Sequence, residues 1–73
     1  MKRHNLYVFR CDKKLNQAEM AEMCGVSRAT YGFIENGKRG GSADFWNTVQ
    51  EVFCLSDEKT RQLQKLEEGT EAE

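Results

Sequence analysis

The spacing of apolar residues predicts helices along this chain, because these residues recur at intervals of three and four, as on one face of an α-helix. Leu6 and Phe9 mark the first helix, which we expect to extend from Asn5 to about Lys13. A second helical face, with members at i, i+3, i+4 and i+7, consists of Gln17, Met20, Ala21 and Cys24. Asn16 precedes this face and Glu19 follows three residues later, a pair that predicts a capping box.

Glycine and serine residues divide the remainder of the chain into three more helices. Gly25 ends the second helix, since glycine adopts the positive φ of a tight turn at no steric cost, and Gly37 is placed to end the third. Three serines stand at N-cap positions, and the helices that they open are expected over Ser27–Asn36, Ser42–Phe53 and Ser56 to about Leu66. No strand is predicted. The pattern therefore predicts an all-α fold of five short helices.

Length and composition restrict the chain to one small domain. Its 73 residues are 38% hydrophobic and 32% charged, which is typical of a folded globular domain. We expect that domain over residues 1–66, followed by a disordered acidic tail, EEGTEAE, over residues 67–73. No apolar stretch approaches the roughly 20 residues that a membrane span needs, and the start MKRHNLYVFR lacks the apolar core of a secretion signal. The expected location is the cytoplasm, with no membrane partner.

The residues with reactive or metal-binding side chains do not form a recognisable site. Cys11, Cys24 and Cys54 are odd in number and widely spaced, and His4 is the only histidine. We interpret the cysteines as small hydrophobic residues in a reducing compartment. We predict no metal, no cofactor and no catalytic residue, so the sequence argues against an enzyme.

Charge is distributed unevenly, although the net charge is only −1. Residues 1–41 contain eight Lys and Arg against four Asp and Glu, a balance of +4, whereas residues 42–73 contain three against eight, a balance of −5. This asymmetry suggests a basic working half and an acidic far end. A pI near 5.8 argues against indiscriminate binding of nucleic acid.

Two helices joined by a short turn that contains glycine form a helix-turn-helix unit. The segment LNQAEMAEMCGVSRATYGFIENGKR resembles the XRE family, the Cro and phage-repressor type of DNA-binding domain. The resemblance extends over about residues 5–66 and is strongest at Gln17, Ala21, Gly25-Val26-Ser27 and Ile34-Glu35-Asn36-Gly37. It implies a lambda-repressor-like fold and a sequence-specific, repressor-like transcriptional regulator. It also implies binding to double-stranded DNA, at a palindromic operator, as a homodimer.

The resemblance makes the third helix, at about residues 27–36, the recognition helix that enters the major groove. The side of this helix opposite its core face carries the candidate base-reading residues, Arg28, Ala29, Gly32 and Phe33. Arg28 suits guanine, since its guanidinium can donate to both O6 and N7. Gly32 suits a close approach of the backbone to DNA. Phe33, where relatives usually have a polar or basic residue, suits either a thymine methyl group or a protein partner.

Phosphate contacts are expected around the helix pair, where a helix N-terminus and basic residues favour an anion. The candidate residues are Gln17, Ser27, Thr30, Asn36, Lys38 and Arg39. Related repressors also contain an ion pair between the first and third helices, and the matching residues here are Arg10 and Glu35. The resemblance gives this pair the role of fixing the recognition helix.

Some positions depart from the family pattern. Gly40-Gly41 stands near the fourth helix, where relatives commonly have proline. Lys14 stands where relatives often have glycine or asparagine, and Cys54 where they often have glycine. Near the C-terminus, Leu55, Leu63 and Leu66 form an apolar stripe that suits either a dimer seam or the closure of the monomer's own core.

A second hypothesis makes the chain a protein-interaction module, such as an antitoxin or an adaptor that uses the same fold. Phe33, Phe45 and the acidic tail motivate it, because apolar and charged surface groups can bind a protein partner. The two functions can coexist in one domain.

Overall fold

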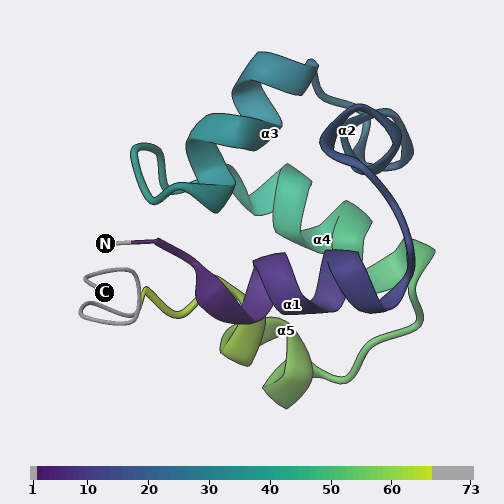
Figure 1. Ribbon diagram of the computed structural model, residues 1–73. Coiled ribbons are helices and arrows are strands. Elements are labelled where there is room, and N and C mark those ends of the chain that lie inside the picture. The colour runs from purple at the N-terminus through teal and green to yellow at the C-terminus, as the bar shows by residue number, and fades with distance from the viewer. Residues whose placement is uncertain (1, 67–73) are drawn as a thin grey trace.

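The computed structural model describes residues 2–66, whose regular elements are five α-helices (Figure 1). In chain order these are α1 His4–Asp12, α2 Gln17–Cys24, α3 Arg28–Glu35, α4 Ala43–Val52 and α5 Asp57–Gln64. The prediction of an all-α fold with five helices is confirmed. The expected acidic tail, residues 67–73, lies outside the described residues. No helix in the described part is long and apolar enough to cross a membrane.

The N-caps read from the sequence explain where four of the helices begin. Asn16 accepts a hydrogen bond from the Glu19 amide and Glu19 returns one to the Asn16 amide, which confirms the predicted capping box at α2. The serine side chains cap α3, α4 and α5 in the same way, each accepting from the amide three residues later, at Ser27, Ser42 and Ser56. The first helix has no side-chain cap, and it begins one residue earlier than expected.

Four helices end in the same kind of turn, in which one residue adopts positive φ and the next amide bonds back to a carbonyl five residues earlier. This is the Schellman geometry, and it favours glycine at the positive-φ position. The residues at that position are Lys14 (φ 60°), Gly25 (φ 76°), Gly37 (φ 80°) and Cys54 (φ 55°). The closing hydrogen bonds are Leu15 to Arg10, Val26 to Ala21, Lys38 to Phe33, and Leu55 to Gln50. Two of the four positions therefore carry a side chain where glycine is favoured.

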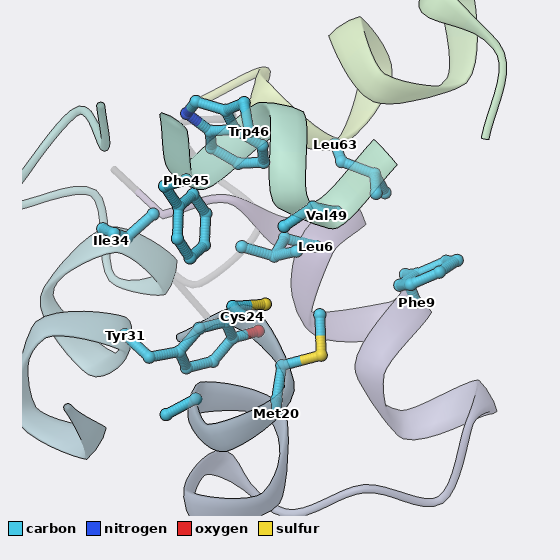
Figure 2. Close-up of a cluster of buried hydrophobic side chains, with 11 residues drawn as sticks. Leu6, Phe9, Met20, Cys24, Tyr31, Ile34, Phe45, Trp46, Val49 and Leu63 are labelled. Atoms are coloured by element: carbon cyan, nitrogen blue, oxygen red, sulfur yellow. The ribbon is translucent and has the colours of Figure 1, made fainter. Parts of the chain in front are cut away.

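The core lies where all five helices meet, and the labelled side chains in Figure 2 converge from each of them. Its buried members are Leu6, Phe9, Met20, Ala21, Cys24, Tyr31, Ile34, Phe45, Trp46, Val49 and Leu63. Leu63 is fully buried and Leu55 packs against the core, so these two residues of the apolar stripe close the monomer. Phe45 is only 3% exposed, which makes it a core residue and removes it as a surface anchor for a partner.

Arg3 is the main structural residue that the sequence pattern did not indicate. It is 6% exposed, and its guanidinium donates to four backbone carbonyls: Ile34 at 2.7 Å, Arg39 at 2.9 Å, Gln64 at 2.9 Å and Gly40 at 3.4 Å. Burial lowers the pKa of Arg3, yet a guanidinium keeps its charge at any physiological pH. One cation thus joins the end of α3, the following loop and the end of α5.

The Gly40-Gly41 loop is held against α4 by Trp46. The indole Nε1 donates to the Gly40 carbonyl at 3.0 Å. At Gly41, φ is 77°, and a Cβ atom there would lie 2.7 Å from the same Nε1. Glycine is therefore required at position 41 by both the backbone and the neighbouring ring.

Candidate nucleic-acid interface

The helix pair α2 and α3 is joined by a turn of three residues, 25–27. In Figure 1, α2 is seen nearly end-on while α3 is seen from the side, so the two helices cross rather than run together. Ala21 lies in α2 and is 2% exposed, so its small side chain belongs to the core. On its inner side α3 buries Tyr31, Ile34 and Glu35. Its other side is left for contacts outside the domain.

The outer side of α3 forms a shallow depression with a volume of about 350 Å³, which we call the α3 hollow. It is lined by Gln17, Arg28, Ala29, Gly32, Phe33 and Asn36. The structure thus brings together all four candidate base-reading residues and two of the candidate phosphate contacts. Arg28 and Ala29 are exposed, Gly32 is partly exposed, and Phe33 is 40% exposed.

The remaining candidate phosphate residues lie outside the hollow, and two of them, Thr30 and Arg39, line a separate depression. Lys38 and Arg39 are exposed and follow the turn that ends α3. The Ser27 hydroxyl is already engaged, since it accepts from the Thr30 amide at 3.1 Å and donates to Thr30 Oγ1 at 2.9 Å. Neither Ser27 nor Thr30 lines the hollow. The exposed cations on and just after α3, among the described residues, are therefore Arg28, Lys38 and Arg39.

Arg10 and Glu35 form an ion pair between α1 and α3. The Nε–Oε2 distance is 3.0 Å, the side chain of Glu35 is 2% exposed, and that of Arg10 is 12% exposed. Arg10 also donates to the Leu15 carbonyl at 2.9 Å, so it holds the corner before α2 as well. Burial acts to lower the pKa of Arg10, but the hydrogen bond and the negative charge of Glu35 outweigh it and raise that pKa.

Gln17 connects this ion pair to the exposed surface. Its side-chain Nε2 donates to Glu35 Oε1 at 2.7 Å, while its side chain also lines the α3 hollow. A chain of polar contacts therefore extends from Arg10 through Glu35 to a residue at the start of α2. Tyr31 lies beside the pair with a buried hydroxyl that has no hydrogen-bond partner among the described residues. Burial, and next the charge of Glu35, raise the pKa of this hydroxyl.

Two contacts at this surface were not predicted from the sequence. The Arg39 guanidinium lies 5.2 Å from the centroid of the Phe33 ring, a cation–π contact made possible by the turn at Gly37. The Gln17–Glu35 hydrogen bond also joins residues of different helices. Neither has a local sequence signal, although a basic residue soon after an exposed aromatic one is compatible with the first. Among the described residues, no group of His, Cys, Asp and Glu is placed to hold a metal ion.

Five helices in the described residues, with α2 and α3 joined by a tight turn and the outer side of α3 exposed, are the architecture of a helix-turn-helix domain. A comparison with protein families matches residues 6–43 to the helix-turn-helix family HTH_3. The chain therefore belongs to this family, which is the XRE type with Cro and phage repressors, as the resemblance implied. Comparisons with curated proteins and with solved structures gave no match.

Proposed function

We propose that this protein is a sequence-specific DNA-binding regulator, repressor-like, that places α3 in the major groove. The observation that carries the proposal is the outer side of α3, where Arg28, Ala29 and Phe33 are exposed while the inner side is packed into the core. An α-helix fits the major groove, and residues near the N-terminus of a recognition helix contact base edges.

Arg28 is the residue that we assign to direct base readout. It is the first residue of α3, it is exposed, and it makes no hydrogen bond to another described residue. Its guanidinium is therefore available to donate to guanine O6 and N7, a pair of bonds that discriminates against the wrong base by about 1–3 kcal/mol. Ala29 and Gly32 keep the neighbouring surface low, so that the helix can approach the base edges.

The phosphate contacts are assigned to groups around the α3 hollow. Lys38 and Arg39 supply the positive charges, with Asn36 and Gln17 as polar contacts at the rim. Gln17 already donates one amide hydrogen to Glu35, which orients its side chain and leaves the other hydrogen for an anion. Ser27 and Thr30, bonded to each other, are weaker candidates.

A homodimer on a palindromic operator is part of the proposal. Recognition helices of a twofold dimer reach half-sites about one helical turn apart. Because Leu63 is buried in the monomer, a dimer surface must use other residues. With two phosphate cations on each protomer, Lys38 and Arg39, a dimer should bind DNA with a log–log salt slope of about −3.6, from roughly −0.9 for each phosphate contact.

Selection from a random duplex library, followed by footprinting, tests this function. We expect one enriched duplex, whose binding perturbs the amide resonances of residues 28–39. Arg28→Ala should relax the base preference at one position per half-site, whereas Lys38→Ala should weaken all duplexes alike. Lys59→Ala, an exposed lysine of α5, is the control and should change neither. Failure to enrich any duplex would refute the proposal.

The second candidate function is a protein-interaction module. The exposed ring of Phe33 supports it, whereas the buried Phe45 does not. Phe45→Ala would damage the core and cannot separate the two functions. Phe33→Ala is the better test: loss of a co-purifying partner with DNA binding intact would favour the module.

A further inference from the structure

The α3 hollow has an apolar side that direct readout by Arg28 leaves unexplained. Ala29, Gly32 and Phe33 form this side, next to the arginine. Hydrogen-bonding readout needs donors and acceptors, and these three side chains provide none. The inference drawn from this apolar side rests on the proposed DNA-binding function.

Gly32 adds space to the hollow that the fold itself does not require. A Cβ atom at this position would meet only Gln17 Oε1, at 3.7 Å, which is ordinary van der Waals contact. The backbone at Gly32 does not adopt positive φ, so its conformation does not require glycine either. Glycine inside a helix is less stable than alanine by about 0.5–1 kcal/mol, so the domain would be more stable with alanine here. The glycine therefore serves the open space above it.

Phe33 presents an apolar wall that the Arg39 side chain supports. Its ring is 40% exposed, and the Arg39 guanidinium stacks over it at 5.2 Å. The cation–π contact holds the ring without covering its remaining exposed area. An apolar group that enters the hollow would be buried between this ring and the backbone at Gly32.

We propose that the α3 hollow receives the C5-methyl group of a pyrimidine, near the guanine that Arg28 bonds. The C5-methyl group is the apolar group that a pyrimidine presents in the major groove. Arg28 and Phe33 are five residues apart, about 7.5 Å along a helix axis. Base pairs are spaced about 3.4 Å apart along DNA, so the distance between Arg28 and Phe33 corresponds to roughly two base-pair steps. The methyl group should therefore lie within about two base pairs of the guanine. Thymine and 5-methylcytosine both carry this methyl group.

Single-base replacements in the duplex enriched by selection test this assignment. Uracil in place of each thymine removes only the methyl group, and 5-methylcytosine in place of each cytosine adds only that group. We expect one position per half-site where uracil weakens binding about fourfold, the factor that burial of one CH₂-sized group gives. Cytosine placed there should regain affinity when it is methylated. Fluorescence anisotropy titrations at constant salt measure these ratios.

Variants of the protein locate the methyl group. Phe33→Ala should reduce the thymine-to-uracil ratio to below about twofold. Gly32→Ala should weaken binding of the thymine duplex several-fold while raising the unfolding midpoint, which separates loss of space from loss of fold. Val52→Ala is the matched control, because Val52 is also 40% exposed but lies at the end of α4, and it should leave the ratio unchanged.

Each outcome decides the matter. Ratios below about twofold at every thymine and cytosine would overturn the methyl assignment while leaving the DNA-binding function in place. An unchanged ratio in Phe33→Ala, or full affinity in Gly32→Ala, would also overturn it, because the methyl group would then lie elsewhere. If no duplex is enriched at all, the proposed function fails and this assignment fails with it.

Discussion

Replacing Arg3 by methionine should destabilise the domain more than removing any one exposed side chain that lines the α3 hollow. Methionine keeps an unbranched stem beside Trp46, whose ring lies 5.6 Å from the guanidinium carbon, and removes only the charged fork. The carbonyls of Ile34, Arg39 and Gln64 then lose bonds of 2.7–2.9 Å. The end of α3 also loses a cation that complements its dipole.

The size of the effect follows from the burial of these bonds. A hydrogen bond to a charged group contributes about 1.5–3 kcal/mol net, and neighbouring bonds are not additive. The bond to Ile34 is buried, whereas those to Arg39, Gly40 and Gln64 are part-buried, so water can replace some of the latter. We therefore expect a loss of about 3 kcal/mol, out of roughly 4–11 kcal/mol for a domain of this length. The melting temperature should fall by about 12–24 °C.

Urea unfolding followed by circular dichroism measures this loss directly. Arg28→Ala is the control, since that exposed arginine makes no hydrogen bond within residues 2–66, and it should change the free energy of unfolding by less than about 0.5 kcal/mol. Arg3→Lys keeps the charge but not the fork, and it should recover less than half of the loss. If the free energy of unfolding of Arg3→Met is within about 1 kcal/mol of the wild-type value, the hydrogen bonds from Arg3 to the carbonyls do not contribute the stability that we assign to them.

Two further predictions concern stability. Lys14→Gly should raise the free energy of unfolding by about 1 kcal/mol, because glycine adopts the positive φ of this position without strain. Lys13→Gly is the control: φ is −83° there, so glycine should lower the free energy of unfolding by about 0.5–1 kcal/mol. Equal urea midpoints for the two variants would contradict this. Burial raises the pKa of Cys24 from 9.0 to about 11. The contribution of the neutral thiol to the free energy of unfolding is therefore fully present below about pH 9 and is lost as the pH rises towards 11. Urea unfolding in reducing buffer between about pH 8 and pH 11 should show a loss of roughly 2–3 kcal/mol, with Tyr31 acting in the same direction. Cys24→Ala should make the profile less steep and leave only the part that comes from Tyr31, and equally steep profiles for the variant and the wild type would refute the assignment.

Most of the fold could be predicted because its signals are local. An N-cap is a contact between residues three apart, so Asn16, Ser27, Ser42 and Ser56 could each be read directly from the chain. Helical spacing likewise assigns the inner face of α3. Arg3 could not be predicted, since its acceptors lie 31 to 61 residues away and are backbone atoms, which have no sequence identity. Phe45 has the pattern of a helical apolar residue, and only tertiary packing shows it to be enclosed.

The candidate site divides in the same way. The residues on the outer side of α3 follow from a helical wheel, so Arg28, Gly32 and Phe33 could be grouped in advance. The contact between Arg39 and Phe33 depends on how the chain turns back after α3. Which groups bond to Gln17 likewise depends on how α2 crosses α3. Side-chain contacts across a turn are tertiary geometry, and spacing along the sequence does not contain them.

The hydrogen bond from Arg3 to the Gln64 carbonyl joins the two ends of the domain. The segment that must be present for stable folding is therefore longer than residues 6–43, which identify the family. Residues 6–43 carry the family match, yet the buried guanidinium precedes that stretch, and its last acceptor, Gln64, lies at the end of α5, beyond nearly all of α4. During synthesis, the cation has its full set of acceptors only after α5 has been made. A fragment cut to the matched residues would retain α3 but not the arginine whose hydrogen bonds hold its end, so binding studies require the chain from Arg3 to at least Gln64.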